Sequence, residues 1–267
     1  MIELQGVHKY FHRGEGHQVH ALRGIDLRIE EGEFVTIIGS NGAGKSTLLN
    51  LIAGVFAPEQ GRILIAGRDV TQQAEHQRAA WIGRVFQNPL DGTSGALTVE
   101  QNLVLALRRG QGMRLRWGVS RARRAQFRAA LARLGMGLED RLQTPVRLLS
   151  GGQRQALTLL MATLQRPRLL LLDEHTAALD PGAAAQVEAL TRAIVARDGL
   201  TTLMVTHNMQ QALTLGTRTL MLHAGQIILD LHGPARDGLS VKDLIALFAR
   251  TRKDLLSDDA LMLSNVS

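Results

Sequence analysis

Apolar and polar residues alternate in short runs along the N-terminal third of the chain. The runs predict strands because turn-forming residues separate them. The predicted strands are residues 2–7, 21–29, 33–40, 62–67 and one within 81–89. A polar loop is expected over 12–18, and a helix over 46–56 follows directly from a glycine-rich turn. We therefore expect an antiparallel β subdomain near the N-terminus.

Further along the chain the apolar residues recur at helical spacing. Two amphipathic helices are expected at 97–109 and 120–135. Helices then alternate with uninterrupted apolar strands, which is typical of a parallel sheet covered on both faces. The predicted helices are 150–166, 181–199, 208–216 and 241–250, and the predicted strands are 169–174, 201–207, 219–225 and 226–231.

This order of elements predicts one α/β domain. Its core comprises residues 1–97 and 146–250, and an inserted α-helical lobe spans 98–145. Residues 251–267 are polar and predict a weakly ordered tail. The expected fold is thus a mostly parallel sheet covered by helices, with an N-terminal antiparallel β subdomain and a helical insertion.

Composition excludes several classes of protein. Of the 267 residues 45% are hydrophobic, which excludes a wholly disordered chain. The absence of cysteine excludes disulfide scaffolds, thiolate zinc sites and cysteine nucleophiles. No apolar run approaches the roughly 18 residues of a membrane span, and the first residues do not resemble a signal peptide. We expect a soluble cytoplasmic protein or a peripheral one.

The positive charge is concentrated in one segment. The net charge is +7, and residues 108–124 contain seven arginines and no acid. Trp117 is the only aromatic residue in that segment, so recognition of single strands by stacked bases is disfavoured. The pattern favours a solvated face near phospholipid headgroups over nucleic-acid recognition. No specific nucleic-acid partner is expected.

A glycine-rich segment between the third strand and the following helix has the spacing G-x-x-x-x-G-K-[ST]. This spacing predicts a P-loop, in which backbone N–H groups and a helix N-terminus surround a phosphate. Lys45 is expected to bridge the β- and γ-phosphates, and the Ser46 hydroxyl to bind Mg²⁺. ATP or GTP is the expected ligand. The predicted binding residues are Gly39, Ser40, Asn41, Gly42, Ala43, Gly44, Lys45, Ser46 and Thr47.

Two carboxylates follow a buried strand in the second half of the chain. Four leucines precede Asp173, which is expected at the carboxyl end of the strand, where open parallel sheets bind ligands. Asp173 is the candidate second ligand of Mg²⁺. Glu174, the next residue, is the candidate catalytic group that polarises a water directed at the γ-phosphate.

The pentapeptide Leu149-Ser150-Gly151-Gly152-Gln153 resembles the signature of ATP-binding-cassette ATPases. The resemblance covers about residues 2–250 and implies a P-loop NTPase core that binds ATP with Mg²⁺. It also implies that residues 150–153 bind the γ-phosphate of ATP held by the opposite protomer. Two copies of the chain would then enclose two nucleotides head to tail.

Four other positions match the family in order. Gln87 matches a glutamine that contacts Mg²⁺ and water, and Asp180 lies in a loop at the dimer interface. His207 matches a histidine that contacts the γ-phosphate. Phe11 matches an aromatic residue that stacks on adenine, although the adjacent Tyr10 is an alternative. The nearby histidines His8, His12, His17 and His20 have a spacing that disfavours a metal site.

Residues 173–181 depart from the family pattern. They form the sequence DEHTAALDP, with His175 where most cassettes have proline. This form resembles a bacterial subgroup of importer ATPases associated with aromatic amino acids such as tryptophan and tyrosine. The resemblance implies a homodimer on the cytoplasmic face of the cell membrane, bound to two integral-membrane permease subunits and served indirectly by an extracytoplasmic solute-binding protein.

Two alternatives remain from the sequence. Systems for export or lipid extraction also use separate ATPase chains. A soluble cassette in DNA repair or translation is disfavoured, because the interval between Gln87 and Ser150 is too short for a long coiled-coil arm.

Overall fold

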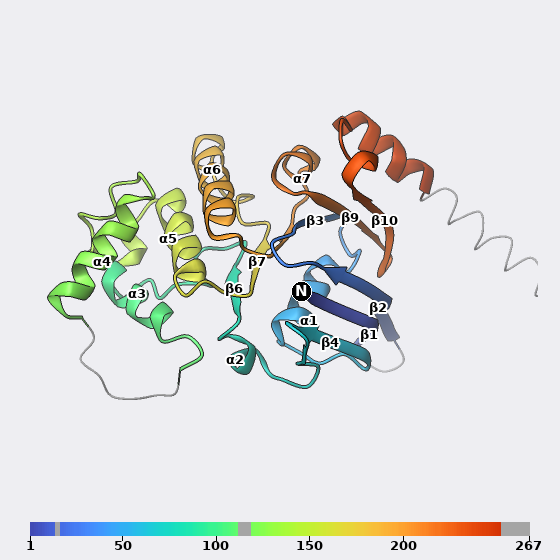
Figure 1. The fold of residues 1–267 in the computed structure, drawn as a ribbon, viewed down its shortest axis with the longest axis horizontal. Coiled ribbons are helices and arrows are strands. Elements are labelled where there is room, and N and C mark those ends of the chain that lie inside the picture. Colours follow the sequence, from blue (N-terminus) through green and yellow to red (C-terminus); the bar gives the residue numbers. More distant parts are fainter. Residues whose placement is uncertain (14–16, 112–118, 252–267) are drawn as a thin grey trace, which may run out of the picture. The chain divides into compact units, whose positions relative to one another are not determined.

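The computed structural model describes residues 1–13, 17–111 and 119–251 (Figure 1). Trp117 and nearly all of the predicted polar tail therefore lie outside the described residues. The chain forms two compact units. The first comprises Met1–Ile52, Pro58–Thr71 and Met204–Ser267, and the second comprises Ala53–Ala57 and Gln72–Leu203. The predicted division into a core and a lobe at 98–145 stays a prediction.

An antiparallel sheet occupies the N-terminal part of the first unit. Its strand order is β2-β1-β4-β5. Buried aliphatic residues such as Ile2, Leu4 and Val7 alternate with polar residues along β1, so one face of the strand packs into the core. The strands are β1 (Ile2–Arg13), β2 (His17–Ile29), β4 (Gln60–Ile65) and β5 (Arg68–Asp69).

The first unit also contains part of the predicted parallel sheet. Strand β3 (Phe34–Gly39) pairs in parallel with β9 (Arg218–His223), which pairs antiparallel with β10 (Gln226–His232). Strand β3 is buried over five consecutive residues, as expected of a strand covered on both faces. The helices of this unit are α1 (Lys45–Ala53), α7 (Met209–Leu215), the 3₁₀ turn η2 (Gly233–Ala235) and residues 241–251.

The second unit combines two parallel strands with most of the helices. Strand β6 (Ile82–Val85) pairs in parallel with β7 (Leu169–Asp173), and β8 (Thr202–Val205) crosses the boundary between the units. The helices are α2 (Glu75–Arg78), α3 (Val99–Leu107), α4 (Arg121–Ala132), η1 (Val146–Leu148), α5 (Gly151–Thr163) and α6 (Pro181–Asp198). Parallel strands with covering helices confirm the predicted α/β class.

One local prediction was wrong at its edges. Residues 12, 13, 17 and 18 of the expected loop lie in strands, because the pairing of β1 with β2 continues to Arg13 opposite His17, and residues 14–16 lie outside the described residues. Pairing of backbone groups there overrides the absence of an apolar pattern. The polar segment 71–80, for which the sequence predicted no element, contains the short helix α2, in which the Gln77 side chain accepts a hydrogen bond from the backbone N–H of Ala74.

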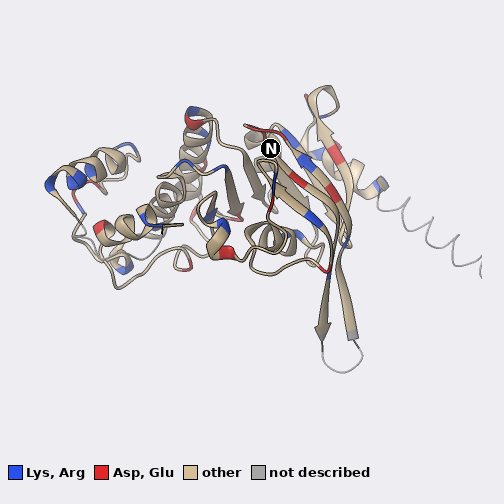
Figure 2. Ribbon diagram, turned by 60° about the horizontal axis from the view of Figure 1, so that its bottom comes forward, with Lys and Arg blue, Asp and Glu red and all other residues tan. Residues whose placement is uncertain are grey.

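The arginine-rich segment is partly used inside the second unit. Helix α4 contains Arg121, Arg123, Arg124 and Arg128 and no acid, so it is a basic element (Figure 2). However, Arg124 Nη2 donates to Glu100 Oε1 of α3 at 3.0 Å, and this bond lowers the pKa of Glu100. Arg109 Nη2 donates to the carbonyl oxygen of Ala162 at 3.0 Å. The segment is therefore only in part a solvated face.

Candidate functional site

The predicted P-loop lies between β3 and α1 in the first unit. Gly39 has φ +154°, and a Cβ there would lie 2.2 Å from the carbonyl oxygen of Leu222 on β9. Gly44 has φ +101°, and its Cβ would lie 2.7 Å from the carbonyl oxygen of Ala21. Only glycine fits both positions. The motif therefore folds as its spacing predicts, with a tight turn directly before a helix.

The Lys45 side chain folds back onto this loop. Its Nζ donates to the carbonyl oxygens of Gly39 at 2.7 Å and of Ser40 at 3.0 Å, and the residue is 6% exposed. By contrast, Ser40, Asn41, Gly42 and Ser46 are exposed. The loop thus combines a buried ammonium group with open backbone and a hydroxyl, which are the groups that bind a phosphate and its cation.

His207 lies at the same edge of the sheet as the P-loop. The backbone N–H of Thr206 donates to the carbonyl oxygen of Ile37 on β3 at 3.1 Å, two residues before Gly39. His207 follows Thr206 and is exposed. Asn208 then caps α7 by accepting from the N–H of Gln211 at 3.1 Å. The fold therefore brings two predicted phosphate-binding elements of the first unit together.

The two candidate adenine-stacking residues differ in their contacts. The Tyr10 ring stacks on His20 with centroids 4.1 Å apart, and His20 Nε2 lies 3.0 Å from His8 Nδ1. The Nζ of Lys9 lies over the Phe11 ring, 5.4 Å from the ring centroid. Burial and His8 both lower the pKa of His20. The structure thus pairs two of the four histidines across adjacent strands, although no group of three metal-ligating side chains occurs in the described residues.

Asp173 ends β7 in the second unit, as predicted. Its Oδ2 lies 3.7 Å from Nη2 of Arg84 on β6. Gln87 follows β6 by two residues and is exposed. Because Val85 pairs in register with Leu172, Gln87 and the two carboxylates meet at one edge of the parallel strands. These groups offer oxygen ligands of the kind that Mg²⁺ prefers.

Glu174 has an unusual backbone conformation for a residue with a side chain. Its φ is +44°, in the left-handed region, and its carbonyl oxygen accepts from the N–H of Ala177 at 2.9 Å. The next residue, His175, is fully buried, and burial lowers its pKa to about 4. A neutral histidine therefore fills the position where the sequence departs from the family pattern.

The signature segment begins helix α5. Ser150 is the N-cap: its Oγ accepts from the N–H of Gln153 at 3.2 Å, and its own N–H donates to Gln153 Oε1. Ser150 and Gly151 are exposed, whereas Gly152 is buried against Ala183 of α6. An exposed helix N-terminus with a serine hydroxyl suits an anionic ligand.

Asp180, which the sequence predicts at a dimer interface, makes a contact within its own chain. Its Oδ1 accepts from the N–H of Ala183 at 3.0 Å, so it is the N-cap of α6. Residues 173–181 are therefore anchored at both ends, by β7 before and α6 after.

Sequence reasoning missed Arg84 and Gln155, and it identified His175 only as a departure from the family pattern, without its burial. Gln155 is fully buried and its Nε2 donates to the carbonyl oxygen of Phe86 at 3.2 Å, which connects α5 to the residue before Gln87. Its position two residues after the signature is a local signal, but its partner is 69 residues away. None of these three contacts can be inferred from spacing.

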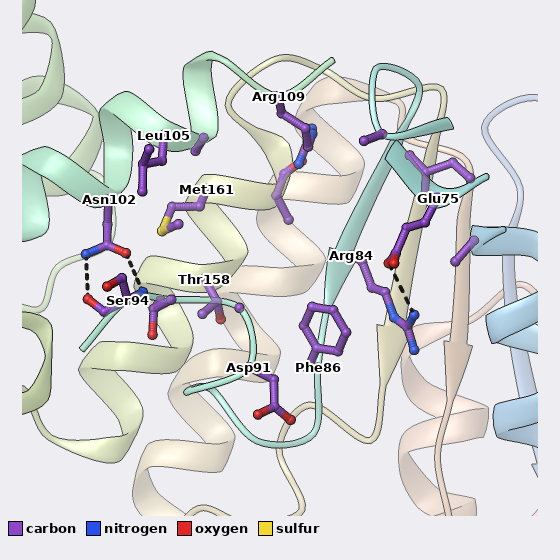
Figure 3. A pocket seen from close by; sticks show the side chains of 17 residues that line it. Glu75, Arg84, Phe86, Asp91, Ser94, Asn102, Leu105, Arg109, Thr158 and Met161 are labelled. Atoms are coloured by element: carbon purple, nitrogen blue, oxygen red, sulfur yellow. Dashed lines mark hydrogen bonds and ion pairs between the residues drawn. The ribbon is translucent and has the colours of Figure 1, made fainter. Parts of the chain in front are cut away.

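A cavity of about 530 Å³ lies within the second unit (Figure 3). Its wall combines apolar side chains with four charged ones. Asn102 shapes one rim, because its Oδ1 accepts from the N–H of Ser94 at 2.8 Å and its Nδ2 donates back to the Ser94 carbonyl oxygen at 3.0 Å. The lining includes Glu75, Ile82, Arg84, Phe86 and Leu105.

The predicted residues fall into two sets. Phe11, the P-loop and His207 belong to the first unit, and Gln87, residues 150–153, Asp173, Glu174 and Asp180 belong to the second. Among the described residues, no helix has the length and apolar character that crossing a membrane requires.

Comparison with known proteins gives consistent matches. A model of the ABC transporter family matches residues 22–177. A tyrosine transport ATP-binding protein of Clostridioides difficile (strain R20291) is 41% identical over 93% of this chain and 98% of its own. A lipoprotein-releasing system ATP-binding protein of Caulobacter vibrioides is 35% identical over 88% of this chain and 97% of its own.

A solved structure matches over a similar extent. It is the dimeric structure of a post-hydrolysis state of an ATP-binding cassette bound to ADP and Pi, and it is 29% identical with a TM-score of 0.73. The match covers 87% of this chain and 98% of the solved one. The chain therefore belongs to the ABC transporter family, as an ATP-binding and ATP-hydrolysing cassette with the P-loop NTPase fold.

Proposed function

We propose that the protein is the ATPase subunit of a bacterial importer, and that its transported solute is an aromatic amino acid. The observation that carries this proposal is the match to the tyrosine transport protein over 98% of that protein's length. The sequence DEHTAALDP at residues 173–181 supports the same subgroup.

The donor set fits Mg²⁺. The Ser46 hydroxyl, the Gln87 amide and the Asp173 carboxylate are all hard oxygen ligands, and no thiolate competes because the chain has no cysteine. When bound, Mg²⁺ neutralises phosphate charge. Lys45 then holds the phosphates through the ammonium group that now contacts Gly39 and Ser40. Thr47 continues the first turn of α1.

Hydrolysis in this proposal depends on Glu174 and His207. Glu174 orients and polarises the attacking water, and His207 donates to the γ-phosphate at the edge of β8. The backbone of Glu174 is left-handed, with φ +44°, so its side chain leaves the chain in a different direction from that of Asp173, the last residue of β7. Phe11 stacks on adenine, with the adjacent Tyr10 as the alternative; Tyr10 already stacks on His20, and Phe11 already contacts Lys9.

The signature and Asp180 act on the partner protomer. Ser150 is exposed at the N-terminus of α5, and Asp180 is exposed at the N-terminus of α6. A head-to-tail homodimer places the Ser150 hydroxyl and the amides of Gly151, Gly152 and Gln153 on the γ-phosphate of the opposite nucleotide. The solved relative is itself dimeric.

The cavity of the second unit is the proposed docking groove for a permease helix. Leu105 is 52% exposed and lines the groove. Leu90, 48% exposed, does not line it but directly precedes Asp91, which does. An amphipathic helix inserted here covers these leucines and contacts the segment after Gln87. The subunit thereby sits on the cytoplasmic face of the membrane, beneath two permease subunits.

A second candidate function is export or lipid extraction. The match to the lipoprotein-releasing protein over 97% of that protein's length favours it. The ATPase chemistry is the same in both proposals. They differ in the direction and in the chemical class of the transported molecule.

Uptake of labelled tyrosine and tryptophan, measured in cells that lack the chromosomal copy, tests the importer. The parent gene restores uptake, whereas Leu105→Asp and Leu90→Asp do not, although both purified variants keep the parent's basal ATPase activity. Ile245→Asp, 49% exposed in the first unit, is the matched control and restores uptake. Normal uptake without the gene, together with lipoprotein retained in the inner membrane, supports the alternative instead.

A further inference from the structure

Arg84 belongs to both the groove and the predicted metal site. Side chains alternate along a strand, so Ile82, Arg84 and Phe86 share one side of the chain, and all three line the groove. Arg84 pairs in register with Leu171 of β7. Asp173, two residues after Leu171, therefore projects from the same face of the neighbouring strand.

The guanidinium of Arg84 is shared between two carboxylates. Nη2 lies 3.7 Å from Oδ2 of Asp173. Nη1 lies 3.8 Å from Oε1 of Glu75, and Figure 3 shows this second pair. Its Cζ lies 4.5 Å from the Phe86 ring centroid, so the planar group also stacks on an aromatic face.

The two ion pairs differ in their exposure to solvent. The side chains of Arg84 and Asp173 are 12% and 17% exposed, whereas that of Glu75 is 54% exposed. The inner pair is therefore shielded, and the outer pair is open to solvent and to whatever occupies the groove. A displacement of the guanidinium toward Glu75 moves positive charge away from Asp173.

We propose that Arg84 regulates the affinity of Asp173 for a divalent cation and transmits occupancy of the groove to that carboxylate. A positive charge this close to Asp173 opposes a second cation there. Glu75 acts in the opposite direction, because it draws the guanidinium outward. A groove occupant that attracts Arg84 therefore raises cation affinity. This inference rests on the proposed roles of Asp173 and of the groove.

The test uses Mn²⁺ as the probe. Affinity is measured by electron paramagnetic resonance on the full chain with stoichiometric ATP, in a Glu174→Gln background that prevents hydrolysis. Arg84→Gln is expected to bind Mn²⁺ about two- to fivefold more tightly, the range of a partly screened ion pair. Glu75→Gln is expected to bind it more weakly by a similar factor. Arg84→Lys and the exposed control Arg121→Gln keep the parent affinity.

The opposite signs separate regulation from a structural role. A merely structural Arg84 predicts weaker Mn²⁺ binding in both variants, and that result, or unchanged affinity, overturns the inference. If Arg84→Gln does not fold, Arg84→Met, which removes the charge but keeps the length of the side chain, replaces it with the same expected sign. Tighter or unchanged Mn²⁺ binding by Glu75→Gln, a largely exposed position, also overturns the inference. Asp173→Asn separates the proposed role of Asp173 as a cation ligand from the proposed role of Arg84. Parent affinity in that variant refutes Asp173 as a ligand, whereas lost affinity there with an unchanged Arg84→Gln refutes only the present inference.

Discussion

His175 Nε2 lies 3.0 Å from Thr191 Oγ1, and both side chains are fully or nearly fully buried. Thr191 Oγ1 donates to the carbonyl oxygen of Val187 at 2.8 Å, so the hydroxyl accepts the His175 hydrogen. This bond attaches the residue after Glu174 to helix α6. A neutral histidine thereby anchors the chain next to the proposed catalytic carboxylate.

Acid should destabilise the protein through His175. Its pKa in the folded state is about 4 because burial disfavours the charged form, whereas the unfolded value is about 6.5. As pH falls below 6.5, His175 binds a proton in the unfolded chain, whereas it stays neutral in the folded protein. The free energy of unfolding therefore falls by up to about 3 kcal/mol between pH 6.5 and pH 4.

Urea unfolding of metal-free protein at a series of pH values measures this loss. His175→Gln removes the titrating group, so the difference between the parent and this variant isolates its contribution from those of the other histidines. Equal pH dependence in the two proteins would contradict the prediction.

Glu174→Gln should keep ATP binding and lose turnover. The amide retains the size of the side chain but cannot act as a base, so the ATPase rate should fall by about 10²- to 10⁴-fold. Phosphate release and binding of a fluorescent ATP analogue measure the two properties, and sedimentation detects the trapped dimer. Glu31→Gln, at an exposed turn, is the charge-matched control. Hydrolysis at the parent rate would remove Glu174 from the mechanism.

The composite site should be detectable by mixing two inactive chains. Ser150→Arg blocks the signature that serves the partner's nucleotide, and Lys45→Ala damages the chain's own phosphate site. A mixed dimer contains one doubly damaged pocket and one intact pocket, so partial ATPase activity should return. Two Lys45→Ala chains alone serve as the control. Activity of isolated Ser150→Arg monomers would argue against a shared site.

The two signature glycines should differ in their tolerance of alanine. A Cβ at Gly152 would lie 2.8 Å from the Cβ of Ala183, whereas a Cβ at Gly151 would lie 3.3 Å from the flexible end of Leu179. Gly152→Ala must separate α5 from α6, so it should be about 1–2 kcal/mol less stable than Gly151→Ala. Thermal unfolding compares them, and equal stability would mean that the helices adjust freely.

Much of the fold and of the candidate site was predictable from the sequence because the signals are local. The P-loop needs only contiguous glycines, Lys45 and Ser46 between a strand and a helix, and the backbone conformation follows from that spacing. Asp173 was likewise predictable, since four leucines identify a buried strand and the next polar residue must end it. Ser150 signals a helix start by its capping pair with Gln153.

Other features depended on which elements pack together. Residues 12, 13, 17 and 18, expected in a polar loop, lie in strands because β1 and β2 pair with each other there. His8 and His20 face each other only because β1 and β2 pair in a shifted register. No spacing within one segment encodes such a contact.

The residues of the candidate site were predictable from local motifs, whereas the contacts that surround them were not. The sequence by itself identified the candidate residues for phosphate binding and hydrolysis, because contiguous motifs set their own backbone geometry. Only the tertiary structure decided that Arg84 pairs with Asp173, that Gln155 reaches Phe86 and that His175 is neutral. Each of these depends on burial and on partners distant in sequence, which exist only once β6, β7, α5 and α6 have packed.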